Sequence, residues 1–228
     1  MSNTVSPPRR NGAGWAGQTA SLYAASGARK YVNAAERQRA LAAMQELPPE
    51  KALFALTLAW TGARVSEVLA LTATSFQVEC GVVAIVTLKR RSFNVREVPI
   101  PPELMAALDR QFELAARQRS PGTASLHLWP WSRVTAWRLI KGVMKLAGVK
   151  GVQACPRGLR HAFAVGTLQA SIPITLTRTW LGHASLRTTA IYTAACGPEE
   201  LAFAERFWRV GTAAGPQFLP RGAPNTRA

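Results

Sequence analysis

The segment WLGHASLRTTAIYT, residues 180–193, contains two side chains that can do chemistry on a phosphate. Tyr192 follows His183 by nine residues and is one of only three tyrosines in the chain. A phenol can attack phosphorus to form a covalent intermediate, and its modest basicity also makes it a usable leaving group for the return step. A tyrosine in such a context is more often a packing residue, so its interpretation depends on what the other segments supply.

Three earlier segments add basic side chains where a hydrophobic core does not need them. WTGARVSEVLAL puts Arg64 just beyond a glycine, at the start of a short helix. TLKRRS puts Lys89 at the end of a β-strand. CPRGLRHAFAV opens another helix with Arg157, Arg160 and His161. Unpaired backbone N–H groups at helix starts favour anions, and guanidinium groups held there can stabilise the charge that builds on an attacked phosphate.

Together these segments resemble the tyrosine recombinase (phage integrase) family. That family has an Arg in a TG-x-R-x-x-E-x-x-x-L block, a Lys on a β-hairpin, an H-x-L-R-H block, an L-G-H block and a Tyr nine residues after that histidine. This chain has, in the same order, TGARVSEVLAL, Lys89, RGLRHAFA and LGHASLRTTAIY, which ends at Tyr192. The resemblance covers roughly residues 33–210 and implies the catalytic-domain fold of the family.

The resemblance also implies a function, a site-specific recombinase that cleaves and rejoins DNA strands through a 3′-phosphotyrosyl intermediate at Tyr192. Arg64 and Arg160 would stabilise the phosphate, and His183 would donate a hydrogen bond to it. Lys89 would protonate the departing 5′ oxygen, with Arg90 in the same turn as the alternative. The chemistry needs neither a metal nor a nucleotide cofactor, and no small-molecule substrate. The expected partners are double-stranded DNA and further copies of the chain, as a tetramer on paired sites.

One position departs from the family pattern. Arg157 stands where the family has the first histidine of H-x-L-R-H, and arginine cannot shuttle a proton near neutral pH. Arg157 can hold phosphate, but activation of Tyr192 must then come from elsewhere or be slow. His161 is one substitute, although this second histidine is usually structural in the family. A catalytically weak or inactive DNA-binding relative with an accessory role in recombination therefore stays as the alternative function.

The composition supports a polyanionic partner. Lys and Arg total 28 against 12 Asp and Glu, a formal net charge of +16. Each cation that docks on a phosphate releases condensed counterions, and the planar fork of arginine can bind two phosphate oxygens at once. We expect DNA contacts from the basic turn and from the segment WSRVTAWRLIKGVMK, whose alternative interpretation is a solvated cationic face. The residues concerned are Arg90, Arg91, Arg133, Arg138, Lys141 and Lys145.

Other classes of protein find no support in the sequence. The cysteines Cys80, Cys155 and Cys196 lie far apart without a CxxC pair, which argues against a disulfide framework and a structural zinc. The chain has no run of about 18 apolar residues and no signal segment, so a cytoplasmic protein without a membrane partner is expected. A type IB topoisomerase shares the chemistry, but the L-G-H and TG-x-R-x-x-E blocks fit recombinases better.

The elements that must position these residues are mainly α, with one small antiparallel β-sheet. The β-branched runs 82–88 and 95–100 flank a basic turn at 89–94 and predict a β-hairpin. Pro121–Gly122 predicts a turn. Helices are expected over 33–46, 51–62, 64–71, 103–119 and, less sharply bounded, 132–147, 157–170, 173–181, 185–194 and 199–209.

The predicted organisation has three parts. Residues 1–30 have the composition of a flexible basic arm, 31–211 form the catalytic domain and 212–228 are a loose tail. Many recombinases of this family also carry a helical core-binding domain that completes a clamp around DNA, whereas here an arm precedes the catalytic body. The amphipathic segment at 198–210 is expected to dock either on a neighbouring protomer or on its own core.

Overall fold

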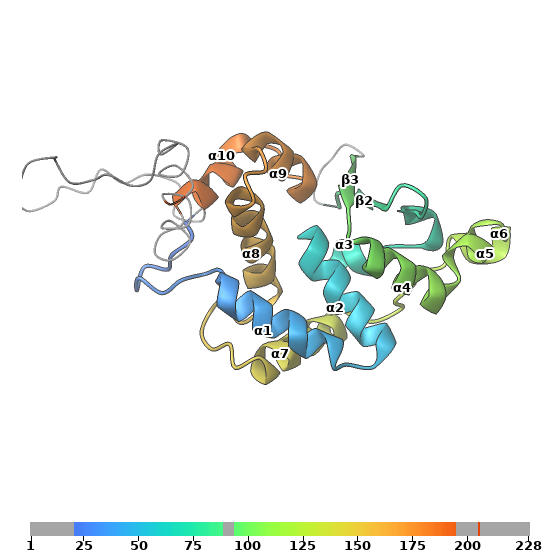
Figure 1. The fold of residues 1–228 in the computed structure, drawn as a ribbon, viewed down its shortest axis with the longest axis horizontal. Helices are drawn as coiled ribbons and strands as arrows, with labels where there is room; N and C mark the ends of the chain where they lie inside the picture. Colours follow the sequence, from blue (N-terminus) through green and yellow to red (C-terminus); the bar gives the residue numbers. More distant parts are fainter. Residues whose placement is uncertain (1–20, 89–93, 195–204, 206–228) are drawn as a thin grey trace, which may run out of the picture.

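The computed structural model describes residues 21–88, 94–194 and 205 (Figure 1). Lys89, Arg90, Arg91 and most of the helix predicted at 199–209 therefore lie outside the described residues. The described elements follow in the order α1 (Ala34–Gln45), α2 (Pro49–Thr61), α3 (Val65–Leu69), η1 (Ala73–Ser75), β1 (Phe76–Gln77), β2 (Val82–Val86), β3 (Val95–Pro99), α4 (Pro102–Phe112), α5 (Leu114–Gln118), α6 (Pro121–Ala124), α7 (Arg133–Leu146), α8 (Pro156–Gln169), α9 (Ile174–Leu181), α10 (Leu186–Ala190) and η2 (Ile191–Ala194).

The predicted fold class is confirmed, because the described part is mostly helical with one small antiparallel sheet. The sheet has the order β1-β2-β3, and the predicted hairpin pairs Val83 with Val98 and Ile85 with Arg96. These four residues are buried, so one face of the hairpin lies on the core. The two-residue strand β1 was not predicted from the sequence.

Local sequence signals set the ends of the first two helices. At the start of α1, Asn33 Oδ1 accepts a hydrogen bond from Glu36 N at 2.8 Å, and Glu36 Oε2 accepts one from Asn33 N at 2.9 Å. This reciprocal capping box satisfies two N–H groups that the helix itself leaves unpaired. Helix α2 ends at Gly62, which has a φ of 60°. A Cβ there would also overlap the ring of Phe163, so glycine lets the end of α2 approach α8 closely.

Helix α2 lies at the centre of the core, in contact with α1, α4 and α8 (Figure 1). Its residues Phe54 and Leu58 are at most 1% exposed. Phe54 meets Trp129 edge-on at 5.5 Å between ring centroids. A second, smaller cluster of buried residues includes Leu22, Leu181 and Tyr192, so the predicted nucleophile belongs to a packed layer of its own.

Two local predictions were wrong. The helix expected over 103–119 is broken at Glu113, which has a φ of 51° and separates α4 from α5. Asp109 Oδ1 accepts a hydrogen bond from Ala115 N at 3.1 Å, which provides the start of α5 with a partner that the sequence pattern did not reveal. At Pro121–Gly122 the chain forms the short helix α6 rather than a simple turn, with Pro121 at its first position.

The last ten residues of the predicted arm contact the folded body. Leu22 is 2% exposed, and Lys30 N donates a hydrogen bond to Leu22 O at 2.7 Å. Arg29 forms an ion pair with Glu36 of α1 at 3.2 Å. The structure thus places residues 21–30 against the layer that contains Tyr192.

No helix within the described residues has the length and apolarity needed to span a membrane.

Candidate active site

Four segments that are distant in the sequence converge at one place beside α8. Arg64 is the N-cap residue of α3, and Arg160 lies in the second turn of α8. His183 follows Gly182, the C-cap residue of α9, and Tyr192 lies in η2. The positive charges of Arg160 and Arg64 both act on the phenol of Tyr192, and the rings of His183 and Tyr192 are 6.3 Å apart. The structure therefore brings together Tyr192, Arg64, Arg160 and His183.

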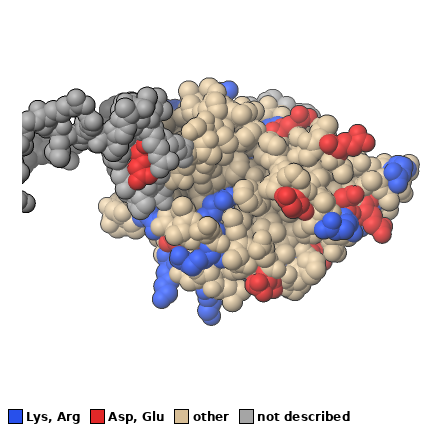
Figure 2. All heavy atoms as spheres, viewed as in Figure 1, with Lys and Arg blue, Asp and Glu red and all other residues tan. Residues whose placement is uncertain are grey.

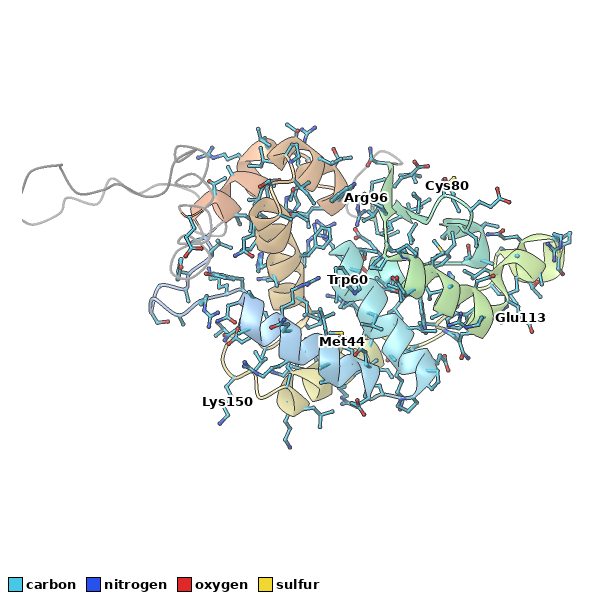
Figure 3. All side chains as sticks on the ribbon, in the orientation of Figure 1. Met44, Trp60, Cys80, Arg96, Glu113 and Lys150 are labelled. Carbon is cyan, nitrogen blue, oxygen red and sulfur yellow. The ribbon has the colours of Figure 1, made fainter. Side chains whose placement is uncertain are left out.

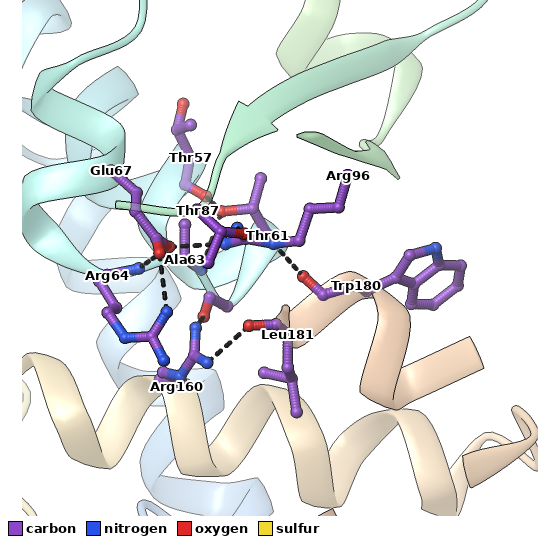
Figure 4. Close-up of polar contacts among 11 residues, drawn as sticks. Thr57, Thr61, Ala63, Arg64, Glu67, Thr87, Arg96, Arg160, Trp180 and Leu181 are labelled. Atoms are coloured by element: carbon purple, nitrogen blue, oxygen red, sulfur yellow. Dashed lines mark hydrogen bonds and ion pairs between the residues drawn. The ribbon is translucent and has the colours of Figure 1, made fainter. Parts of the chain in front are cut away.

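Arg160 ties three of these segments together. Its Nη1 donates to Gly62 O and its Nη2 to Leu181 O, both at 2.6 Å (Figure 4). These carbonyls lie at the C-terminal ends of α2 and α9, where unpaired carbonyl groups attract a cation. Burial, and then the charge of Arg64, lower the pKa of Arg160 to about 10, so the guanidinium is protonated at neutral pH. Its side chain is a buried cation held rigidly by backbone.

Glu67 holds Arg64 in place. The carboxylate is 1% exposed and accepts hydrogen bonds from Arg64 N at 2.9 Å and Arg64 Nη1 at 2.7 Å (Figure 4). Burial raises the pKa of Glu67, but Arg96 and the hydrogen bonds from Arg64 lower it, and the net shift is downward. Glu67 is therefore ionised at neutral pH, and it fixes both the backbone and the side chain of Arg64.

Arg96 completes this network and was missed by the sequence reasoning. It lies on β3 at the side of the sheet that faces α9 (Figure 3), and it is 3% exposed. Its Nη2 donates to Glu67 Oε2 at 2.6 Å, its Nη1 to Thr87 Oγ1 at 2.9 Å and its Nε to Trp180 O at 2.7 Å. One side chain thus connects the β-hairpin to α3 and to the end of α9.

The sequence contains a signal for Arg96. Val98 and Ile100 follow Arg96 at two and four residues, so the strand predicted at 95–100 has an apolar side. Because side chains on one face of a strand recur every second residue, Arg96 shares that side. A buried arginine needs an anionic partner, and Glu67 in the TG-x-R-x-x-E block is the acid that supplies it.

Tyr192 is buried and carries its proton. The side chain is 2% exposed, and its hydroxyl lies 2.9 Å from Nδ1 of His161. The ring of His183 is nearly parallel to that of Tyr192, with 12° between the planes. Burial raises the pKa of Tyr192 to about 12, although Arg160 and Arg64 oppose this shift. The arginines therefore already favour the phenolate that attack on phosphorus would require.

Both histidines of the site are neutral at pH 7. Burial, and then the charges of Arg160, Arg157 and Lys30, lower the pKa of His161 to about 4. Burial, and then Arg160 and Arg64, lower the pKa of His183 to about 3. His183 Nδ1 lies 2.9 Å from Thr189 Oγ1. Thr189 is 0% exposed, so α10 fixes the orientation of the His183 imidazole.

Arg157 does not join the buried cluster. It is the second residue of α8 and is exposed to solvent. His161 lies four residues further along the helix, so the two positions share a face about one turn apart. In the family pattern the first of these positions carries the histidine that transfers protons, whereas in this structure the residue at the second position contacts the tyrosine.

The residues predicted to bind DNA on α7 differ in their availability. Arg133, Arg138 and Lys145 are exposed. Lys141 is half-buried, and its Nζ donates a hydrogen bond to Ala154 O at 2.9 Å. Lys141 also lies 5.8 Å from the ring centroid of Trp137. Its ammonium therefore already has partners within the protein.

Charge is distributed unevenly over the molecule. Residues 114–194, which include α7 to α10, contain no Asp or Glu. The hairpin and α4 contain Glu97, Glu103 and Asp109, and acidic side chains gather at that end of the molecule in Figure 2. The basic residues of α7 to α10 and of the segments between them are Arg133, Arg138, Lys141, Lys145, Lys150, Arg157, Arg160, Arg178 and Arg187. The half of the body around α8 thus offers a surface suited to a polyanion.

The described residues contain no group of three or more His, Cys, Asp or Glu side chains arranged to hold a metal ion. The basic character of the site comes instead from arginines, whose guanidinium groups bind phosphate oxygens directly.

Comparison with known proteins agrees with this geometry. A family model, that of the phage integrase family, matches residues 30–196. The chain therefore belongs to the phage integrase family. It is 32% identical over 139 residues to the tyrosine recombinase XerD of Yersinia pestis. This match covers 58% of this chain and 46% of that protein. It is also 32% identical over 148 residues to the tyrosine recombinase XerA of Pyrococcus furiosus. That match covers 62% of this chain and 49% of that protein.

Solved structures show the same fold. The crystal structure of XerA recombinase has a TM-score of 0.63 and 26% sequence identity, covering 79% of this chain and 64% of that one. XerH site-specific recombinase, bound to palindromic difH substrate in a post-cleavage complex, also has a TM-score of 0.63, at 21% identity, covering 79% of this chain and 53% of that one. The chain spans about half the length of the curated relatives that it matches.

Proposed function

We propose that this protein is a site-specific DNA recombinase that cleaves and rejoins strands through a 3′-phosphotyrosyl intermediate at Tyr192. The observation that carries the proposal is the convergence of Tyr192 with two fixed arginines, Arg64 and Arg160, from segments far apart in the sequence. A buried phenol beside two fixed cations has little structural purpose, because either arginine would be solvated at lower cost on the surface.

The other residues of the site assist the attack of Tyr192. Arg64 and Arg160 stabilise the negative non-bridging oxygens during attack, and losing such a donor typically costs about 10²–10³ in rate. His183, oriented by Thr189, donates a hydrogen bond to the same phosphate. Lys89, by analogy with the family, protonates the departing 5′ oxygen, and Arg157 binds phosphate from the exposed start of α8.

DNA and further copies of the chain are the proposed partners. Arg90, Arg91, Arg133, Arg138 and Lys145 bind the DNA backbone, whereas Lys141 mainly supports α7. The XerH site-specific recombinase is bound to a palindromic difH substrate in its post-cleavage complex, which supports a recombination site in DNA as the partner here. The working form is a tetramer on paired sites, in the cytoplasm, without metal or cofactor.

A selection for covalent adducts tests the proposal. The substrates are duplexes of randomised sequence that carry closely spaced nicks, so that cleavage releases a short piece that diffuses away. They are incubated with the protein, and protein-linked DNA is recovered under denaturing conditions. We expect adducts enriched in one sequence for the wild-type protein and none for Tyr192→Phe. Tyr23→Phe is the matched control and should behave as wild type, because it removes only the hydroxyl of a half-buried tyrosine and keeps the ring that packs against the Tyr192 layer. Enriched binding without any adduct would contradict the proposal.

One observation favours the second candidate, a DNA-binding relative with little catalysis. Arg157, exposed at the start of α8, stands where the family has a proton-transferring histidine. The variant Arg157→His distinguishes the two, since we expect it to form adducts at an equal or higher rate than the wild type. A large loss of rate would show that Arg157 has a role of its own on the phosphate.

A further inference from the structure

The hydrogen bond between Tyr192 and His161 joins the reacting atom to a titratable group. Tyr192 Oη lies 2.9 Å from His161 Nδ1, and the ring centroids are 5.6 Å apart. The two residues are 31 positions apart in sequence, and the contact is made by packing of α8 against η2. Because the phenol is only 2% exposed, this nitrogen takes the place that water would hold at an exposed tyrosine.

At neutral pH both partners of this hydrogen bond are uncharged. The pKa of Tyr192 is raised to about 12, so its hydroxyl carries the proton. The pKa of His161 is lowered to about 4, so its imidazole is neutral. A neutral imidazole has one nitrogen with a free lone pair, and here Nδ1 is the nitrogen that faces the phenol. In the tautomer that carries its hydrogen on Nε2, the hydroxyl of Tyr192 donates and Nδ1 accepts.

We propose that His161 is the catalytic proton acceptor for Tyr192, in place of the exposed Arg157 one helical turn away. The proposal rests on the recombinase function proposed above. As Tyr192 Oη forms a bond to phosphorus, its proton passes to His161 Nδ1 and the bond between phosphorus and the 5′ oxygen breaks. The 5′ oxygen leaves with the electron pair and takes a proton from a protonated amine or from water. In the return step the 5′ hydroxyl gives its proton back to that amine or to hydroxide as its oxygen attacks phosphorus, and the departing phenolate recovers its proton from His161.

Binding of DNA would prepare His161 for this step. The charged groups that act on His161 are Arg160 on the same helix, Arg157 at its start and Lys30 from the segment before α1. All three are cations, and they disfavour an imidazolium in the free protein. A phosphate bound at Arg160 would offset that charge, so the affinity of His161 for a proton rises when the substrate is present.

Two substitutions separate proton transfer from simple positioning. His161→Asn keeps an oxygen near the place of Nδ1 and can accept the hydrogen bond, but it cannot take up the proton. His161→Ala removes both. General acid–base catalysis by a side chain contributes about 10²–10⁴ in rate, so we expect both variants to cleave about 10²–10⁴ times more slowly. Thermal unfolding, monitored by circular dichroism, verifies that each variant is folded.

The measurement is the single-turnover rate of adduct formation on the nicked duplex recovered in the selection described above. His127→Ala, at an exposed histidine outside the site, is the matched control and should keep the wild-type rate. Added imidazole should restore part of the rate of His161→Ala. A duplex with sulfur in place of the bridging 5′ oxygen needs no acid for its leaving group, so it should leave the defect of His161→Ala unchanged.

The outcomes are distinct. A wild-type rate in His161→Asn together with a slow His161→Ala would overturn the proposal and make His161 a positioning residue. Wild-type rates in both variants would overturn it outright while leaving the recombinase function intact. If the wild-type protein forms no adduct on any duplex, the proposed function fails and the role of His161 fails with it.

Discussion

The two sides of the site are built by different means. On the arginine side, Arg64, Arg96 and Arg160 are fixed by Glu67 and by backbone carbonyls at the ends of two helices. On the tyrosine side, Tyr192 is held by one hydrogen bond to His161 and by contact with the ring of His183. Charge that must stabilise a transition state has to be oriented before the reaction. A nucleophile must instead change its bonding during each half of the reaction, so a single neutral hydrogen bond suits it better than a network of ions.

The arginine side should respond most strongly to the loss of its anion. Glu67→Ala leaves Arg96 buried without a charge partner, and breaking a buried ion pair from one side typically costs about 3–5 kcal/mol. We expect a decrease of that size in the free energy of unfolding, measured by urea denaturation. Glu97→Ala removes an exposed acid from β3, the strand that carries Arg96, and should lower the free energy of unfolding much less. Equal effects of the two variants would show that the network does not hold the arginines.

A second change tests the geometry of the arginine side while keeping its charge. Arg160→Lys retains the cation, but an ammonium cannot reach both Gly62 O and Leu181 O in the planar arrangement of the guanidinium. We expect single-turnover cleavage to fall by about 10²–10³. Arg178→Lys, on α9, is the control. A rate within a few-fold of wild type in Arg160→Lys would mean that charge alone, without the two anchors, is sufficient.

The tyrosine side should be more sensitive to mild acid. The pKa values of His161 and His183 in the folded protein are about 4 and about 3, below the ordinary value of 6.5. As pH falls below 6.5 the unfolded chain binds protons that the folded chain does not, so stability decreases down to about pH 4. The shift at Glu67 acts only below its ordinary pKa of 4.5. Urea denaturation at about pH 7 and about pH 5 should therefore show a loss that belongs to the histidines.

Variants assign this pH dependence to its source. His161→Asn and His183→Asn should each reduce the difference in the free energy of unfolding between the two pH values, because each removes one group that titrates only in the unfolded chain. His127→Asn should leave the difference unchanged. An unaltered difference in the variant that lacks both site histidines would contradict the assignment.

The smallest expected effect concerns the orientation of His183. Thr189→Val keeps the shape of the buried side chain but removes the hydroxyl that meets His183 Nδ1. A single such hydrogen bond typically contributes about 0.5–1.5 kcal/mol, so we expect a loss of about 1 kcal/mol in stability and a few-fold slower cleavage. Thr188→Val, at the exposed neighbour, is the control. A loss of cleavage as large as that of Arg160→Lys would show that His183 must be held as rigidly as the arginine side.

Much of the fold could be predicted because its signals are local. The capping box at Asn33, the glycine at position 62 and the paired β-branched runs of the hairpin each act within a few residues. The break at Glu113 could not be predicted, because the hydrogen bond from Ala115 N to Asp109 that accompanies it leaves no trace in the apolar spacing of 103–119. The arm at 21–30 packs on residues far along the chain, and composition alone does not carry such contacts.

By itself the sequence determined which side chains are proposed to act on the phosphate and in what order they follow, since the spacing from His183 to Tyr192 and the arginine blocks can be read from it directly. It also put Arg157 and His161 on one face of a helix, because the period of the α-helix fixes which residues share a face. Only the tertiary structure decided that His161 meets the phenol while Arg157 faces solvent, and that Arg96 anchors the site from within. The physical reason is that helical periodicity fixes only the direction of a side chain around the axis of α8. The position along that axis at which η2 makes contact depends on how the whole body packs.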